Sequence, residues 1–329
     1  MSLVRAETRR LFKRRFTSVI LIGVVLIMSA VVAGTFFSNQ KVTDTQIAAA
    51  KAEADQYYQD AVKMVAQEKQ KCVADNPTNA AQCEWPDPSP SDYDYQWYMP
   101  ETFELRAEYG NMITLLAVLL ASAAFLIGAS FVGSEWHSGG MMNLLLWRPK
   151  RLQVLSTKLA VVLSWFTGLS LLLGALWTGA FVLIANLRGS TEKMTSGVWQ
   201  SFGLTGLRGI ALVVVAGALG FALASLGRHT GMALGALVGI GALQIGVYIM
   251  ASMTGAKYPE AWLLPVWGFA WMYKEYVVQD YNSCNSSSDS GCEPDTFLMT
   301  WQTAGIGMAI ATVLVVGAAM YAMRRRDIA

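Results

Sequence analysis

Six stretches of this chain are long and apolar enough to cross a lipid bilayer. Each runs for 19 to 28 residues, and a helix crossing a hydrocarbon core of roughly 30 Å needs about 20 apolar residues. Only 15% of the 329 residues are charged, against about 25% in soluble domains, which excludes a plain cytosolic enzyme and a disordered protein. We therefore predict an all-α integral membrane protein. The predicted spans are residues 17–37, 111–133, 159–186, 209–227, 231–253 and 302–323.

The charges predict the orientation of these spans. Six spans put both termini on one side of the membrane, together with residues 134–158 and 228–230. That side carries fourteen Lys and Arg against three Asp and Glu, whereas the other side carries eleven against twenty. Because Lys and Arg resist translocation, the basic side is predicted to be cytoplasmic. We expect a multi-pass protein of the inner (plasma) membrane, whose first span is too long for a cleaved signal peptide.

The segments outside the spans have distinct compositions. Residues 1–16 predict a basic interfacial helix held by anionic lipid, although a simple topology anchor fits the same residues. Residues 38–110 predict an extracytoplasmic domain with a helix over 44–71, whose small residues would pack on another helix, such as the same helix of a partner subunit. The aromatic run that follows is interpreted as an interfacial belt or packed cap in preference to a substrate site. The helical stripe is Ile47, Ala50, Ala54, Tyr57, Ala61 and Met64.

Residues 254–301, before the last span, predict broken helices and a loop on the outer side. The stretch 258–277 is apolar and aromatic, but Pro265 and Gly268 interrupt it too early for a span. Helix halves that dip into the outer leaflet fit this pattern if protein covers their backbone. Residues 324–329 form a cytoplasmic tail.

All four cysteines fall in the two outer segments, where a disulfide can form. Their spacings are not the short pairs that a zinc site prefers. Local pairing, Cys72 with Cys83 and Cys284 with Cys292, is the simplest of the three possible arrangements, and free thiols are the alternative.

Gly231, Gly235 and Gly239 repeat at every fourth residue of the fifth span. Small residues at this spacing let membrane helices approach closely, so the repeat predicts helix packing. The link of four residues, 227–230, predicts a tight hairpin with the fourth span. Gln244 is expected to bond a neighbouring helix.

Several kinds of chemistry are absent from the sequence. No Asp, Glu, Lys, Arg or His lies within the spans as drawn, although Arg208 lies just outside the fourth, which disfavours proton-coupled transport and intramembrane proteolysis. The chain has no G-x-x-x-x-G-K-[ST] loop for ATP and no basic character that suggests nucleic acid. His137 and His229 lie in separate inner loops, so no shared metal site is expected.

The cytoplasmic loop 134–158 carries the most informative motif. Gly139 and Gly140 interrupt the helix after Glu135, a short apolar run follows, and Pro149 ends it beside Arg148, Lys150 and Arg151. This pattern predicts an amphipathic segment that could insert into a soluble partner, or an ordinary interfacial loop.

The loop resembles a motif of the type-two ABC export permeases, E-x-x-x-G-T…L-L…P-x-x-R…K. Gly140 stands where Thr is customary, and Arg151 follows Pro149 by two positions where three is commoner. The basic end of the chain, the six spans and the broken outer helices extend the resemblance over nearly the whole chain. The matching residues are Glu135, Gly139, Leu144, Leu145, Pro149, Arg151 and Lys158.

This resemblance implies a permease that works as a homodimer or with a related permease, above two cytoplasmic ABC ATPase subunits. The loop would be the coupling helix, pushed when ATP closes those subunits. ATP and Mg²⁺ would bind the partner subunits, so this chain would hold no cofactor and no catalytic residue. The implied function is export of an amphiphilic substrate, such as a peptide antibiotic, drug or lipid, in contact with membrane lipids.

Two readings from other classes compete with this one. A membrane sensor or scaffold with a disulfide-bonded outer domain would be expected to carry a cytosolic signalling domain, yet the longest inner loop, residues 134–158, is short. A sodium-driven carrier predicts inverted repeats and helices broken at mid-membrane, which the sequence does not display.

Overall fold

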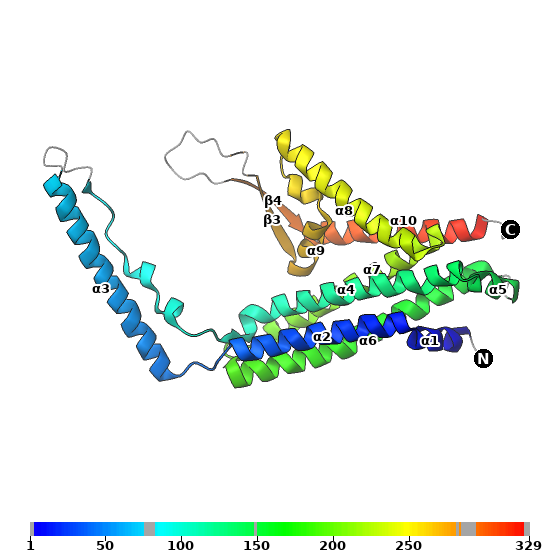
Figure 1. The fold of residues 1–329 in the computed structure, drawn as a ribbon, viewed down its shortest axis with the longest axis horizontal. Helices are drawn as coiled ribbons and strands as arrows, with labels where there is room; N and C mark the ends of the chain where they lie inside the picture. Colours follow the sequence, from blue (N-terminus) through cyan, green and yellow to red (C-terminus); the bar gives the residue numbers. More distant parts are fainter. Residues whose placement is uncertain (1–2, 76–82, 148–149, 281–282, 284–293, 326–329) are drawn as a thin grey trace. The chain divides into compact units, whose positions relative to one another are not determined.

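The computed structural model describes residues 3–75, 83–147, 150–280, 283 and 294–325. Long helices dominate this part of the chain, and short turns and two small sheets join them (Figure 1). The chain is an all-α integral membrane protein in fold class, as predicted.

Six described helices are long and apolar enough to span a bilayer, one for each predicted span. Each helix is longer than its predicted span, because helical hydrogen bonding continues into the flanking residues. The longest has 38 residues, which corresponds to about 57 Å. The six are α2 (Arg15–Ser38), α4 (Leu105–His137), α6 (Arg151–Arg188), α7 (Ser196–Gly227), α8 (Thr230–Met253) and α10 (Trp301–Arg325).

Two short helices lie at the end of the bundle where the N- and C-terminal ends of the chain are found. They are α1 (Leu3–Lys13), which precedes α2, and α5 (Gly140–Trp147), which connects α4 with α6 (Figure 1). The sequence predicted both as amphipathic segments.

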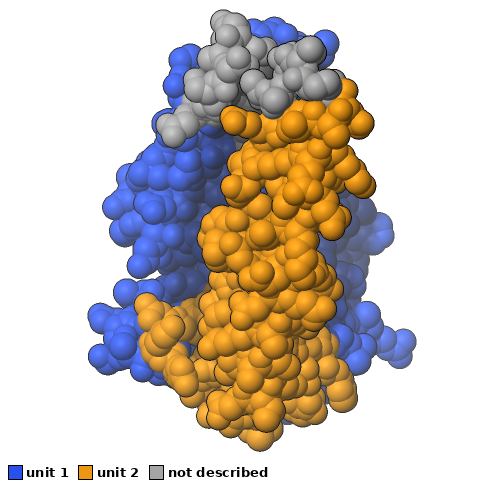
Figure 2. All heavy atoms as spheres, turned by 90° about the vertical axis from the view of Figure 1, so that its left-hand side faces the viewer, with its two compact units in different colours: residues 1–30, 109–179, 194–329 blue, residues 31–108, 180–193 orange. Residues whose placement is uncertain are grey.

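The chain divides into two compact units, which Figure 2 colours separately. Unit 1 contains residues 1–30, 109–179 and 194–329, and unit 2 contains residues 31–108 and 180–193. The charged side chains that meet at the end of α4, and the cleft between α4, α6 and α7, both lie wholly within unit 1.

Glycines bring α4 and α7 into close contact within unit 1. A Cβ at Gly128 of α4 would lie 2.6 Å from the carbonyl oxygen of Gly217, and a Cβ at Gly220 of α7 would clash with the carbonyl oxygen of Phe125. Without a hydrophobic drive in lipid, membrane helices depend on such backbone approach. Gly128 and Gly220 therefore let the backbones of α4 and α7 approach each other.

The glycine repeat of α8 has a different environment. At Gly235 and Gly239 nothing in the described chain lies within 4 Å of an added Cβ, because this stripe of α8 is exposed. The backbone N–H of Gly231 donates to His229 Nδ1 (2.9 Å) at the start of the helix. The predicted short hairpin from α7 is present, whereas close packing at Gly235 and Gly239 stays a prediction that a neighbouring molecule would have to fulfil.

The segment after α8 combines a broken helix with a hairpin. A 3-10 turn, η4 (Pro259–Trp262), leads into α9 (Leu264–Tyr273), and β3 (Glu275–Asp280) pairs antiparallel with β4 (Asp295–Thr300). The side chain of Gln244 donates to Trp262 O and accepts from Leu264 N, both at 3.4 Å. Gln244 thus bonds the broken segment. The hairpin of β3 and β4 was not predicted from the sequence.

Unit 2 is built on one long helix and the segment that returns along it. Helix α3 (Asp44–Asp75) covers the predicted stripe, in which Ala50 and Ala54 are buried, and aromatic rings of η2 (Pro90–Tyr93) and η3 (Tyr95–Tyr98) pack on it. Tyr57 stacks on Tyr98, with ring centroids 5.2 Å apart. The stripe therefore packs against its own chain, and the aromatic run forms the packed cap.

A disulfide and a small sheet complete unit 2. Cys72 and Cys83 are joined, with Cα atoms 5.7 Å apart, as predicted; Cys284 and Cys292 lie outside the described residues. The short strands β1 (Phe103–Glu104) and β2 (Gly189–Ser190) pair in parallel.

Candidate functional site: an ionic network at the end of α4

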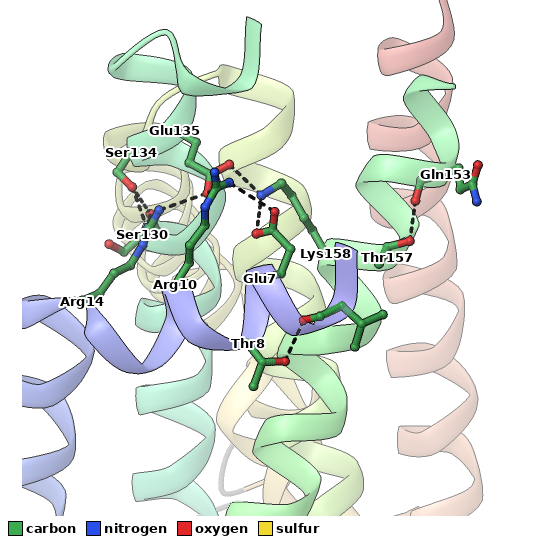
Figure 3. A network of polar contacts seen from close by, with 11 residues as sticks. Glu7, Thr8, Arg10, Arg14, Ser130, Ser134, Glu135, Gln153, Thr157 and Lys158 are labelled. Atoms are coloured by element: carbon green, nitrogen blue, oxygen red, sulfur yellow. Dashed lines mark hydrogen bonds and ion pairs between the residues drawn. The ribbon is translucent and has the colours of Figure 1, made fainter. Parts of the chain in front are cut away.

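Charged side chains from three helices meet where α4 ends and α6 begins (Figure 3). Figure 3 shows them pointing toward one another across the gap between the helices. We call this set the ionic network. Its members are Glu7 and Arg10 of α1, Arg14 between α1 and α2, Glu135 of α4, and Lys158 of α6.

Helix α1 turns its ionic face toward the bundle. Glu7 and Leu11 are four residues apart, which places them on one face of α1, and Arg14 follows directly after the helix ends. Glu7 and Leu11 are fully buried, whereas Val4 and Phe12 are more than half exposed. Val4 and Phe12 therefore face outward, where lipid would meet them.

Lys158 lies at the centre of the ionic network. Its Nζ is 2.6 Å from Glu7 Oε2 and 2.7 Å from Glu135 Oε2. Its side chain is fully buried, and the ammonium lies 5.2 Å from the centroid of the Phe131 ring. One cation thus joins carboxylates from two different helices.

Arg14 holds the same end of α4 from the other side. Its Nη1 donates to the backbone oxygen of Ser130 (2.9 Å) and to Ser134 Oγ (2.7 Å). Its Nη2 lies 3.3 Å from Glu135 Oε1. Arg14 therefore fixes the last turns of α4 and the orientation of Glu135.

The charges of the buried members balance. Lys158 and Arg14 face Glu7 and Glu135, while Arg10 is half exposed and lies 3.3 Å from Glu7 Oε1. Burial lowers the pKa of Arg14 below its usual range, and Glu135 and Glu7 act in the opposite direction. Removing one partner of a buried ion pair costs about 3–5 kcal/mol. The network therefore ties α1, α4 and α6 together, and a relative movement has to break or exchange its ion pairs.

The loop continues from Glu135 into a sharp bend and α5. Gly139 has a φ of +71°, which suits glycine because other residues are strained there. On α5, Met141 and Leu145 share one buried face, whereas Leu146 and Trp147 are 79% and 86% exposed. The helix is thus anchored by one face and presents two large apolar side chains on another.

The structure brings together only part of the predicted site. Glu135 and Lys158 are in direct contact, and Gly139 and Gly140 form the bend and the start of α5. Leu145 is buried and Leu144 is partly buried, so they anchor α5. Arg151 begins α6. Pro149 lies outside the described residues.

Sequence reasoning missed the contribution of α1 to this site. Glu7 and Arg14 counted there only as charges that set the topology. Glu7 is the one acid among six bases in residues 1–16, and an isolated acid in a basic segment is a signal for an internal ion pair. Trp147, the most exposed apolar side chain of α5, was also missed, whereas Leu146 belongs to the apolar run that was expected to insert into a partner.

Two histidines also lie side by side near this end, although they belong to separate inner loops of the sequence. The rings of His137 and His229 have centroids 5.4 Å apart, because the turn between α7 and α8 lies beside the end of α4. Nδ1 of His229 already accepts the Gly231 N–H. Among the residues that the structure describes, no group of three or more His, Cys, Asp or Glu is arranged to hold a metal ion.

Comparison with protein families identifies the family of this chain. Residues 8–328 match the family described as ABC-2 family transporter proteins. No curated protein and no solved structure matches the chain. The match covers nearly the whole sequence, including α5, all six spans and every member of the ionic network except Glu7. This chain therefore belongs to the ABC-2 family of membrane transport permeases.

Proposed function

We propose that the chain is the permease subunit of an ATP-driven ABC exporter, which works as a dimer while separate cytoplasmic subunits hydrolyse ATP. The observation that carries this proposal is the direct connection of exposed α5 to the ionic network. Trp147 and Leu146 offer an apolar contact to a soluble partner, and Glu135 lies a few residues away at the centre of buried charges.

The proposed coupling runs through these contacts. When ATP closes the partner subunits, they push α5. Because Met141 and Leu145 anchor α5, the push reaches α4 at Gly139 and Glu135, and from there α6 through Lys158 and α1 through Glu7. Coupling between sites needs a packed element with two discrete arrangements. Arg10 Nη1, 3.9 Å from Glu135 Oε1, is positioned to become an alternative partner when Lys158 moves.

The orientation and the division of labour follow from charge and motif. The basic side of the membrane, which carries α1 and α5, is the cytoplasmic side of the inner (plasma) membrane by the positive-inside rule. The Cys72–Cys83 disulfide then belongs to the opposite, oxidising side. The sequence contains no phosphate-binding G-x-x-x-x-G-K-[ST] loop, so ATP and Mg²⁺ are assigned to the partner subunits.

An amphiphilic substrate fits the scarcity of charge in the spans. A peptide antibiotic, a drug or a lipid would each bring apolar surface into the bundle. A second permease copy, or a related permease, would complete the pathway.

Purification from native membranes tests the proposal. We expect an ABC ATPase to co-purify, with ATPase activity that a transported amphiphile stimulates and that Glu135→Ala reduces. Glu192→Ala, on an exposed loop, is the matched control and should leave stimulation unchanged. Recovery without any ATPase, or full stimulation of the Glu135→Ala complex, contradicts the proposal.

A further inference from the structure

A cleft of about 310 Å³ opens between α4, α6 and α7, wholly within unit 1. It starts near Tyr109 and Thr178, away from the ionic network, and continues toward Leu120 and Ser170. Gly203 and Leu207 on its edge are exposed, so the cleft opens sideways toward the space that lipid fills. None of the residues that line it is charged.

Glycines create this cleft. At Gly174 of α6 and at Gly203 and Gly206 of α7, nothing in the described chain lies within 4 Å of an added Cβ. These glycines therefore do not serve close helix packing, unlike Gly220 further along α7, where a Cβ would clash with backbone. Protein interiors are normally densely packed. Because these glycines have no side chain, the space between the helices stays open at their positions.

Polar atoms mark two positions along the cleft. Thr178 Oγ1 donates to Gly174 O (2.8 Å), so the 2.5 Å contact with Tyr109 is donated by the tyrosine hydroxyl. At the deeper position the hydroxyl of Ser170 is buried, with the residue 5% exposed, and has no hydrogen-bond partner in the described chain. Buried hydroxyls are normally bonded, so Ser170 indicates a missing polar partner.

We propose that this cleft binds the alkyl chain of an uncharged, single-chain amphiphile that enters from the bilayer and bonds Ser170 with one polar group. The uncharged lining excludes an ionised group, since burying one without a partner is strongly unfavourable. The volume is near the lower end of ligand pockets, about 300–1,000 Å³, which suits one chain and excludes the paired chains of a phospholipid. Identification of this ligand as the exported substrate rests on the proposed function.

Photolabelling of the full-length protein tests the proposal. The protein is placed in phosphatidylcholine nanodiscs with a medium-chain monoacylglycerol that carries a diazirine at mid-chain, and labelled peptides are mapped by mass spectrometry. We expect labels on the cleft segments of α4, α6 and α7, reduced about tenfold by excess unlabelled monoacylglycerol. Labels on exposed Leu237 and Val238 of α8 should not compete and serve as the internal control.

Variants sharpen this result. Gly203→Leu fills the cleft and should remove the competed label, whereas Gly168→Leu adds the same side chain at an exposed position of α6 outside the cleft and should not. Ser170→Ala should weaken competition. If instead it raises thermal stability and leaves labelling unchanged, the hydroxyl has no ligand.

Three outcomes overturn the proposal: labelling of the cleft that does not compete in the wild-type protein, labelling that survives Gly203→Leu, and equal labelling by a diazirine phosphatidylcholine, which would indicate bilayer lipid. The wild-type competition decides the matter if a variant fails to fold. Because labelling requires no ATP, failure of the proposed function would appear separately, as a missing ATPase partner beside a competed label.

Discussion

Helices α4 and α6 border two regions of opposite character. Where α4 ends and α6 begins, both helices meet α1 in the ionic network, and Lys158 is fully buried between two carboxylates. Further along, they and α7 leave a cleft of about 310 Å³ in which Ser170 has no partner. One region is filled with balanced charge, and the other is left open by missing side chains.

The difference suggests a division of roles along the same two helices. Ion pairs in a buried site exchange between discrete arrangements, because an intermediate position leaves a charge without a partner. A glycine-lined cleft can change its volume without breaking strong contacts. We therefore expect substitutions in the ionic network to lower stability strongly, and equal substitutions in the cleft to change it little.

The largest effect should follow from Lys158→Met. It leaves Glu7 and Glu135 facing each other without a buried cation, so the free energy of unfolding should fall by about 3–5 kcal/mol. Denaturant unfolding in detergent measures the loss, with exposed Lys150→Met as control. Combining Lys158→Met with Glu7→Gln and Glu135→Gln should recover much of it. A loss below about 1 kcal/mol in the single variant would show that the ion pairs do not hold the helices together.

A second test compares two glycines on α7. Gly220→Ala should lower the free energy of unfolding by about 1–3 kcal/mol, because its Cβ would clash with the backbone of Phe125 and force the helices apart. Gly203→Ala, which has open space around its Cβ, should change it by no more than about 0.5 kcal/mol. Thermal unfolding of the two variants side by side gives the comparison, and equal losses would remove the distinction between packed and open halves.

The bend between α4 and α5 should respond less strongly. Gly139→Ala puts a side chain on a residue with positive φ, which raises the conformational free energy of the bend by about 1–2 kcal/mol. The variant should therefore reduce ATPase stimulation in the complex. Gly139→Pro should act more strongly, since proline cannot adopt that φ. Gly168→Ala, at an exposed position inside α6, is the control. Unchanged stimulation in Gly139→Ala would mean that the bend does not transmit force.

The smallest effect on stability should come from Trp147→Ala. Its side chain is 86% exposed, so unfolding should shift by no more than about 0.5 kcal/mol. Co-purification of the ATPase should nevertheless decrease, because the apolar contact is lost. Trp97→Ala, 71% exposed in unit 2, should leave co-purification intact. Equal recovery of the ATPase with both variants would separate α5 from the partner.

The six spans were predictable because the thickness of a bilayer sets the length and the apolarity that a spanning helix needs. The hairpin of β3 and β4 was not. Its strands are separated by a long Ser- and Asp-rich segment rather than by the two-residue turn that makes a hairpin recognisable. The stripe of α3 indicated a packed face, and Ala50 and Ala54 are buried. The expected neighbour was another helix, however, and a one-dimensional pattern could not reveal that the returning segment of the same chain lies there.

Like the fold, the candidate site was only partly predictable from the sequence. Glu135 and Lys158 were identified through a motif, whereas Glu7 was not, because no local spacing encodes a partner 151 residues away. The continuous apolar run of α5 gave no indication of which side faces inward, so buried Leu145 was selected and exposed Trp147 was overlooked. The cleft depends on which glycines lack neighbours, and only the assembled helices reveal that.

The wide separation of Glu7 and Lys158 has a consequence for the order of biosynthesis. Helix α1 leaves the ribosome long before its counter-ion is made, so Glu7 remains in water until the third span has been inserted. Docking of the N-terminal helix is then a late event that reports successful insertion of α4 and α6. A nascent chain halted before Lys158 would therefore carry an N-terminal helix that lacks its buried partner.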